Sequence, residues 1–216
     1  MKNSLKDKRL LFLGSTPNIA GMVKTAKEMG VYVLVTDNKS LENAPAKQIA
    51  DEYADISLAD IDKVVDYIKE KNVDGVLTGF SDAYLAYYEE ICEKSGLPCY
   101  GDKKTFAIAT DKMCFKKACD ESGVGTIPGI NAYSYEEALE FAEKSSFPLM
   151  LKPADNSGSR GVIKCQSLDE LKNAYEYALS FSHTKNVMCE RFMACDGIGV
   201  SYKKKNSEEY LSSTCD

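Results

Sequence analysis

Short apolar runs alternate with segments of helical periodicity through the first hundred residues of this 216-residue chain. Apolar residues that recur every three or four positions predict helices, because that spacing places them on one face. Uninterrupted apolar strands are typical of a parallel sheet that is covered on both faces. The expected strands are residues 9–13, 31–36, 53–56 and 75–78, with 97–100 as a candidate fifth strand, and the expected helices are 18–30, 60–71 and 82–95. This alternation predicts an α/β fold built on a parallel sheet.

Small and polar residues follow the first and the fourth of these strands. In parallel α/β sheets, ligands bind at the carboxyl ends of the strands. The candidate substrate-binding residues at this edge are Gly14, Ser15, Thr16, Ser81 and Asp82. Ordinary turn and helix-cap chemistry is the alternative for each of them taken singly.

Two common nucleotide-binding motifs are absent from the sequence. Asp37 ends the second strand about 20 residues after the first glycine turn, where a ribose-binding acid would stand. The pattern G-x-G-x-x-G is nevertheless missing, because the next glycine after Gly14 is Gly21. The P-loop pattern G-x-x-x-x-G-K-[ST] does not occur either. The sequence therefore argues against a nicotinamide dinucleotide site and against a P-loop.

The pattern of elements changes after Gly101. One of the later helices begins with a capping box, Ser134 followed three residues on by Glu137. The expected helices are 102–110, 111–122, 134–145 and 168–181, the expected strands are 129–132, 148–151, 161–164 and 186–192, and a hairpin pairs 197–203 with 209–213. The second half is therefore expected to be an α+β structure.

The most informative segment of the second half is FPLMLKPADNSGSRGVIK, residues 147–164. An apolar strand delivers Lys152 at its end, and the small-residue loop 157–161 follows before the next strand. Glycine and serine let the backbone approach a ligand and turn N–H groups toward one point. Lysine adds a compact positive charge. The layout fits a polyphosphate, and a plain hairpin is the alternative, because short motifs often match by accident.

Composition excludes several classes of function. The net charge is −6 and the pI is about 5.0, which argues against a broad nucleic-acid surface. No long uncharged apolar stretch predicts a membrane span. A single histidine, His183, leaves little material for a zinc site or a histidine-based triad. Eight cysteines without a C-x-x-C pair predict reduced thiols in a cytoplasmic protein.

Three motifs stand in a fixed order along the second half. Lys112 lies in DKxxFKxxxxxxG, Lys152 in FPLMLKP before the SGSRG loop, and Glu190 in VMCERFM. This order and spacing resembles the ATP-grasp superfamily, most closely its branch with carbamoyl-phosphate synthase and biotin-carboxylase-like ligases. The resemblance covers nearly the whole chain. It implies a Rossmann-like pre-ATP-grasp domain over residues 1–103 and, over 104–216, the small ATP-grasp subdomain with the start of the large one.

The resemblance also implies an ATP site. Lys112 and Lys152 would bind the α- and β-phosphates, and the loop would close over the β- and γ-phosphates. Glu190 would accept a hydrogen bond from the adenine amino group. Backbone groups of Arg191 and Met193 would read the adenine edge, while Phe192 and Met193 would flank the ring. The complete set of cofactor-binding candidates is Lys112, Lys152, Ser157, Gly158, Ser159, Arg160, Gly161, Glu190, Arg191, Phe192 and Met193.

Each of these roles has a plainer alternative. Lys112 at a helix start fits a surface lysine, the usual place for that residue type. Glu190 fits the exposed member of an alternating strand. Phe192 and Met193 fit a hydrophobic core.

The sequence departs from the superfamily pattern at two places. The glutamate that usually contacts the ribose is absent from residues 194–198, where Asp196 is the available substitute. The acidic and asparagine ligands of magnesium would lie on strands beyond Asp216. The chain is therefore interpreted as C-terminally truncated and inactive on its own, and neither a catalytic residue nor a metal ligand is assigned in it.

The favoured interpretation is the ATP-binding part of an ATP-grasp ligase. Such an enzyme activates a carboxylate as an acyl phosphate and joins it to an amine or a similar nucleophile. ATP is the expected cofactor, with magnesium in the full-length protein. The expected partners are small-molecule substrates and, through an exposed sheet edge, a second copy of the chain. The alternative function is a non-catalytic α/β module that binds a nucleotide or metabolite.

Overall fold

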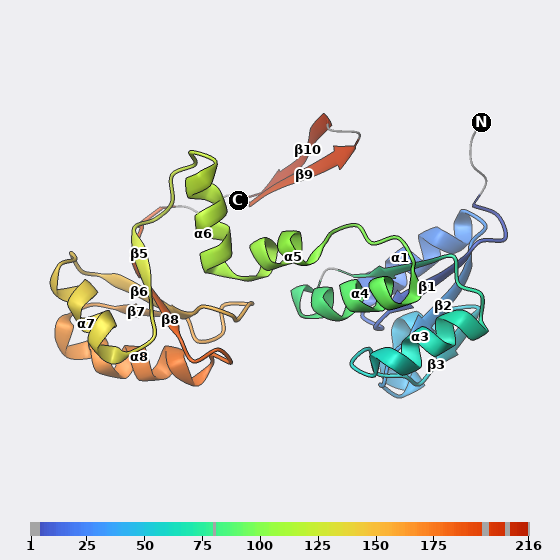
Figure 1. Ribbon diagram of the computed structural model, residues 1–216, viewed down its shortest axis with the longest axis horizontal. Helices are drawn as coiled ribbons and strands as arrows, with labels where there is room; N and C mark the ends of the chain where they lie inside the picture. The colour runs from blue at the N-terminus through green and yellow to red at the C-terminus, as the bar shows by residue number, and fades with distance from the viewer. Residues whose placement is uncertain (1–4, 80, 196–198, 206–207, 216) are drawn as a thin grey trace. The chain divides into compact units, whose positions relative to one another are not determined.

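The computed structural model describes residues 5–79, 81–195, 199–205 and 208–215. The chain forms two compact units, Met1–Val124 and Gly125–Asp216. Figure 1 shows the elements of each unit along the chain. The two helices at residues 103–110 and 112–121 belong by their contacts to the first unit. The domain boundary expected between residues 103 and 104 stays a prediction.

The first unit is built on a four-stranded parallel sheet. Its strands are β1 (Arg9–Leu13), β2 (Tyr32–Thr36), β3 (Glu52–Ala54) and β4 (Gly75–Thr78). They lie in the order β3-β2-β1-β4, and every neighbouring pair is parallel. This confirms the predicted parallel α/β fold. The strand order reverses at β1, because β2 and β3 lie on one side of it and β4 lies on the other. In such sheets, ligands bind beside the carboxyl ends of the two strands at this reversal, here β1 and β4.

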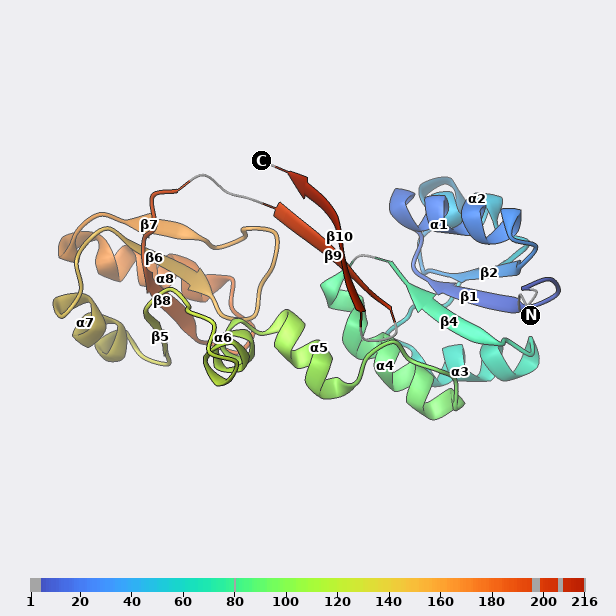
Figure 2. The same ribbon diagram turned by 90° about the horizontal axis from the view of Figure 1, so that it is seen from above.

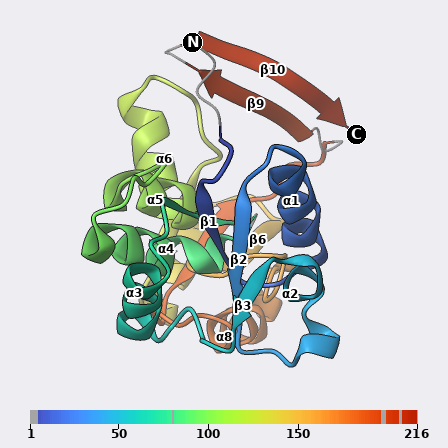
Figure 3. The same ribbon diagram turned by 90° about the vertical axis from the view of Figure 1, so that its right-hand side faces the viewer.

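Helices cover both faces of this sheet. The α-helices are α1 (Pro17–Glu28), α2 (Pro45–Ile49), α3 (Ile61–Glu70), α4 (Asp82–Ser95), α5 (Lys103–Thr110) and α6 (Lys112–Glu121), with a short 3-10 turn η1 at Leu41–Asn43. In Figure 2, α1 and α2 lie above the sheet, and α3 and α4 lie below it. Figure 3 shows the same two layers from the end of the unit.

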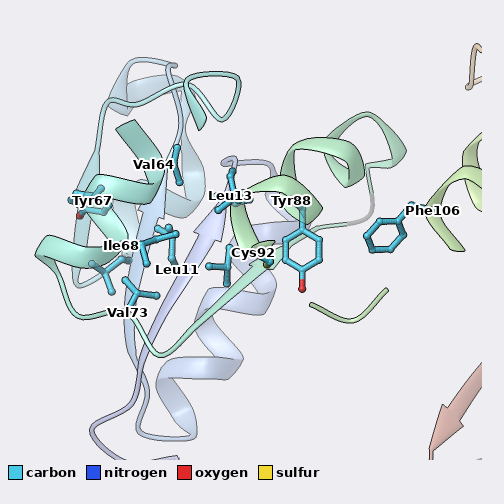
Figure 4. Packing of buried hydrophobic residues seen from close by; sticks show 12 residues of the cluster. Leu11, Leu13, Val64, Tyr67, Ile68, Val73, Tyr88, Cys92 and Phe106 are labelled. Carbon is cyan, nitrogen blue, oxygen red and sulfur yellow. The ribbon is translucent and has the colours of Figure 1, made fainter. Parts of the chain in front are cut away.

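Strand alternation divides the core of the first unit between these layers. Leu11 and Leu13 are buried with Val64 and Ile91 on the α3–α4 side, whereas Phe12 is buried with the α1–α2 residues. Successive strand side chains point to opposite faces, so a solid apolar run serves both layers at once. Figure 4 shows the α3–α4 cluster.

The candidate fifth strand at 97–100 does not form. Helix α4 ends at Ser95 and is capped by Gly96, which has a left-handed φ of 69°. The N–H of Leu97 donates to the Cys92 carbonyl at 3.0 Å, so the chain turns back toward the helix it has just left. Pro98 also lacks the N–H that a strand ladder needs. The apolar composition of the segment reflects packing against α4 rather than sheet pairing.

The second unit has a four-stranded antiparallel sheet of its own. Its strands are β5 (Gly129–Ala132), β6 (Leu149–Pro153), β7 (Ile163–Cys165) and β8 (Val187–Arg191), in the order β5-β8-β6-β7. Its helices are α7 (Tyr135–Glu143) and α8 (Leu171–Ser180), with the 3-10 turn η2 at Leu168–Glu170. Both helices pack with the sheet into a single core. The α+β character of this half is confirmed.

The predicted capping box at the start of α7 is also present. The Ser134 hydroxyl accepts from the Glu137 N–H at 3.2 Å, and the Glu137 carboxylate accepts from the Tyr133 N–H at 2.7 Å. These bonds satisfy N–H groups that a helix start leaves without an intrahelical partner.

The predicted C-terminal hairpin forms between β9 (Gly199–Lys205) and β10 (Glu208–Cys215), which pair antiparallel. Residues 197–198 and 206–207 of that prediction, and Asp196 before it, lie outside the described residues. Across the described ranges, no helix has the length and apolar character that a membrane crossing requires.

Candidate functional site

The sheet of the second unit has two different faces. Leu149, Leu151 and Cys189 point to the face that α7 and α8 cover, and all three are fully buried in that core. The residues between them point to the opposite face. Met150 and Glu190 stand directly across from each other on β6 and β8, and neighbours that face each other in a ladder share a side of the sheet. Glu190, a predicted site residue, therefore lies on this second face.

Lys152 and Glu190 form an ion pair on this face. Lys152 stands two residues beyond Met150, so its ammonium reaches Glu190 diagonally across the ladder. The Glu190 side chain is only 4% exposed, whereas that of Lys152 is 23% exposed. A carboxylate so deeply buried requires charged or hydrogen-bonding partners. The exposed-strand alternative for Glu190 is therefore wrong, and the structure brings two predicted residues together.

Lys164 also lies on this face, and it was not among the predicted site residues. It stands opposite Met150 on β7, and its ammonium lies 4.1 Å from the centroid of the Phe192 ring, a cation–π distance. Strand alternation in residues 163–165 was the available signal, since it places Lys164 between two inward-facing neighbours.

The backbone after β8 is partly engaged within the protein. The Arg191 N–H donates to the Pro128 carbonyl and the Phe192 N–H to the Pro148 carbonyl, both at 3.1 Å. Phe192 is half-buried and Met193 is 45% exposed, so neither is a core residue. The Arg191 side chain is exposed. Adenine recognition by residues 191–193 stays a prediction, and the Arg191 N–H already has an acceptor.

Asp155 anchors the base of the predicted phosphate loop. Its carboxylate accepts from the Ser182 hydroxyl and from the N–H groups of His183 and Thr184, each at 2.9 Å. Burial opposes the charged form, but the hydrogen bonds from Ser182, Thr184 and His183 outweigh it and lower the pKa of Asp155. The loop is thus tied to the turn between α8 and β8. Its anchor was not among the predicted site residues.

The loop itself has an unusual backbone. Gly158, Ser159 and Gly161 all have left-handed φ values, of 66°, 57° and 75°. A Cβ added at Gly161 would lie 2.7 Å from the Phe181 Cβ. Both this close contact and the left-handed φ therefore require glycine at position 161. Arg160 Nε donates to the Ser157 carbonyl at 3.3 Å. Residues 157–160 are exposed, and their contact with phosphate stays a prediction.

Lys112 is the first residue of α6, in the first unit, and is half-buried. Asp111 caps this helix, because its carboxylate accepts from the N–H groups of Met113 and Cys114, both at 2.8 Å. The cap sets the position of Lys112 on the first turn. Its convergence with Lys152 on one triphosphate stays a prediction.

The candidate residues at the strand ends of the first unit form turns and helix starts in the structure. Gly14 has a φ of 88°, and a Cβ there would lie 2.7 Å from the Tyr84 ring. The Ser15 hydroxyl, buried at 1% exposure, accepts from the N–H groups that start α2, and the Thr16 hydroxyl accepts from the Ile19 N–H at 3.3 Å. Ser81 and Asp82 form the start of α4. A substrate role for these five residues stays a prediction.

The described residues contain no group of three or more histidine, cysteine, aspartate or glutamate side chains placed to hold a metal ion. Charged residues on the sheet face that α7 and α8 do not cover include Lys152, Glu190 and Lys164.

Comparison with known proteins shows similarity to one family of ATP-binding domains. Residues 111–196 match the family described as carbamoyl-phosphate synthase L chain, ATP binding domain. The chain is 25% identical over 80% of its length to the 2-oxoglutarate carboxylase small subunit of Hydrogenobacter thermophilus, of which it covers 39%. It is 27% identical over 88% of its length to formate-dependent phosphoribosylglycinamide formyltransferase of Bacteroides thetaiotaomicron, of which it covers 49%.

Solved structures agree in fold. N5-carboxyaminoimidazole synthetase from Staphylococcus aureus, complexed with ADP, matches with a TM-score of 0.78 and 18% identity over 98% of this chain and 55% of its own. The biotin carboxylase domain of Hydrogenobacter thermophilus 2-oxoglutarate carboxylase, a dimer in complex with MgADP, ADP and bicarbonate, matches with a TM-score of 0.74 and 23% identity, over 86% and 44%.

These matches share one superfamily. The family match over residues 111–196 indicates the ATP-grasp superfamily, as the order of the motifs predicts. It spans about half the length of the curated relatives it matches.

Proposed function

We propose that this chain supplies the ATP-binding part of an ATP-grasp ligase. The observation that carries the proposal is the Lys152–Glu190 pair. It lies on the face of the second unit's sheet that α7 and α8 do not cover, within the segment that matches the ATP-binding family. A donor and an acceptor of opposite charge stand together there, at the base of a loop of small residues. The non-catalytic alternative is less well supported, because the relatives named above are carboxylases, synthetases and transferases.

The two charged groups have different tasks in this proposal. The Lys152 ammonium donates to a phosphate oxygen, and charge-assisted bonds of this kind are among the stronger hydrogen bonds in proteins. The Glu190 carboxylate accepts from the adenine amino group. Lys164 and Phe192 border the same face, so the base would lie against an aromatic ring that already carries a cation on one side.

The reaction proposed for the whole protein has two steps. A carboxylate oxygen attacks the γ-phosphorus of ATP, which forms an acyl phosphate and releases ADP. An amine or similar nucleophile then attacks the acyl carbon and releases phosphate. The residues of this chain bind and orient the nucleotide and neutralise its charge, which is most of what phosphoryl transfer asks of a protein. Magnesium, when bound, neutralises further phosphate charge.

The substrates and surroundings of the protein follow from the same proposal. Small-molecule carboxylates and amines are the substrates, and Gly14–Thr16 with Ser81 and Asp82 are the candidate contacts. Homodimer formation and a cytoplasmic location are part of the proposal, the latter supported by the free thiols of the seven cysteines that the structure describes.

Nucleotide binding is tested by calorimetric titration of the 216-residue chain with ATP and magnesium. Lys152→Met should lower the affinity about tenfold or more, because one charge-assisted bond is lost. The matched control is Lys144→Met, since Lys144 is an exposed lysine of the same unit that pairs with Glu140. Its affinity should equal that of the wild type.

The unfolding midpoint of each variant without nucleotide separates loss of binding from loss of fold. Failure of the wild-type chain to bind ATP would contradict the proposal. So would a folded Lys152→Met variant that binds ATP as tightly as the wild type.

A further inference from the structure

Tyr88 and Cys92 are buried in the core of the first unit, and the half-buried Cys99 packs against the same core. Tyr88 and Cys92 are four residues apart on α4, so they occupy the same face of the helix. Both are 1% exposed. Figure 4 shows Tyr88 and Cys92 among the core residues, with Phe106 beyond the Tyr88 ring.

The turn after α4 brings a second thiol to this place. Gly96 reverses the chain, and the Leu97 N–H returns to the Cys92 carbonyl at 3.0 Å. Three residues later the Tyr100 N–H donates to the Tyr88 hydroxyl at 3.3 Å, and the two rings stack with centroids 4.6 Å apart. Residues 97–100 therefore run back along the last turns of the helix.

Cys99 lies on this returning segment, between Leu97, which bonds to Cys92, and Tyr100, which bonds to Tyr88. Cys99 packs against the core cluster that contains Cys92 and Tyr88. Burial, and then the adjacent Cys99 thiol, raise the pKa of Cys92 to about 12. The two thiols are thus neighbours that only seven positions of chain separate, and the left-handed Gly96 is what lets that short loop close.

The two thiols differ in access. Cys92 is buried, whereas Cys99 is half-buried and lines a hollow of about 330 Å³ together with Pro98 and Tyr100. A small thiol reagent can therefore reach Cys99 first. Cys165 and Cys189 also lie near each other in the second unit, but both are fully buried and offer no such entry.

We propose that Cys92 and Cys99 are a dithiol that forms a reversible disulfide. The oxidant is a small disulfide such as oxidised glutathione. The Cys99 thiolate attacks one glutathione sulfur, which forms a mixed disulfide and releases one glutathione thiol. The Cys92 thiol then gives up its proton as its sulfur attacks the Cys99 sulfur, and the second glutathione leaves as a thiolate that takes up a proton. Two protein thiols are oxidised and one glutathione disulfide is reduced to two thiols.

The disulfide would act on the connection to α5. Residues 100–102 link the Cys99 segment to that helix, and Phe106 of α5 packs edge-on against the Tyr100 ring, with centroids 5.6 Å apart. A covalent bond at Cys99 would hold this connection on α4. The proposal does not depend on nucleotide binding and stands or fails separately from it.

The test equilibrates the full 216-residue chain with mixtures of oxidised and reduced glutathione. Acid quenching, alkylation of the remaining thiols and peptide mass analysis then locate the bond. We expect one disulfide that joins the peptides of Cys92 and Cys99, and we expect reducing agent to reverse it. Cys99→Ser should abolish it, and the control Cys119→Ser, at a half-buried thiol of α6, should leave it unchanged.

The order of attack has its own variant. Cys92→Ala should trap the intermediate, so that Cys99 carries one bound glutathione under conditions that oxidise the wild type. Thermal unfolding checks that each variant is folded. Recovery of both thiols as alkylated cysteine from folded wild-type protein in oxidised glutathione would overturn the proposal. A bond between other cysteines, or an unmodified Cys99 in folded Cys92→Ala, would overturn it as well.

Discussion

At the scale of single residues, the ion pair of Lys152 and Glu190 is the feature that the site depends on. Its two members differ in environment, because the lysine side chain keeps 23% exposure and the glutamate 4%. The flexible lysine side chain can turn its ammonium toward water, whereas the buried Glu190 carboxylate cannot reach solvent without a larger rearrangement. Removing the lysine should therefore cost more free energy of unfolding than removing the charge of the glutamate.

This asymmetry predicts unequal costs in the free energy of unfolding. Lys152→Met should lower it by about 3 kcal/mol, because it removes the ammonium from a buried charge. Glu190→Gln should lower it by about 1 kcal/mol, because Lys152 can reorient to solvent. Urea denaturation measures both. The double variant should be more stable than Lys152→Met alone, and equal losses for the two single variants would show that the asymmetry is absent.

At the scale of elements, the loop between β6 and β7 is shaped by its backbone and by its anchor. Asp155 ties the start of the loop to the α8–β8 turn, and Gly161 ends it against Phe181. Between these points the chain takes left-handed conformations that few side chains tolerate. The loop is thus held at both ends and exposed between them, which is the arrangement expected of a cover that closes on a ligand.

Three glycine substitutions separate backbone strain from close packing. Gly161→Ala should lower the free energy of unfolding by about 2–4 kcal/mol, because it combines a left-handed φ with a clash against Phe181. Gly158→Ala should cost about 1 kcal/mol, since its φ is left-handed but its surroundings are open. Gly125→Ala is the control, with open space and no left-handed φ. Urea denaturation should reproduce this order, and an equal cost at 158 and 161 would contradict the packing argument.

At the scale of the whole molecule, the chain combines a parallel α/β unit with an antiparallel α+β unit, each with its own core. The ATP-binding family matches residues 111–196, which begin in the first unit and extend into the second. Lys112 and Lys152 therefore belong to different units.

We predict that the 216-residue chain alone binds ATP without turning it over. The described residues hold no group of three or more acidic, histidine or cysteine side chains placed for a metal ion, and without a metal's charge neutralisation the γ-phosphate is poorly activated. Release of phosphate from ATP with magnesium measures this. Lys152→Met is the control for contaminating activity. Lysine-dependent hydrolysis by the isolated chain would refute the prediction.

The sequence alone determined the class of the fold and the order of the motifs. Local periodicity marks strands such as 9–13 and 75–78, and these formed, because alternation and apolar runs report directly which faces are buried. The capping box of Ser134 and Glu137 was equally readable, since its bonds join residues three or four positions apart.

Only the tertiary structure decided which polar residues meet. Register brings Lys152 to Glu190 and Lys164 opposite Met150, and register depends on pairing between strands far apart in the chain. The segment at 97–100 is apolar enough for a strand, yet the left-handed turn at Gly96 returns it to α4 and sets Cys99 beside Cys92. The local sequence pattern indicates which residues are buried, whereas packing between distant segments determines which residues are in contact. The contact partners of Glu190 and Cys92 therefore could not be predicted from the sequence.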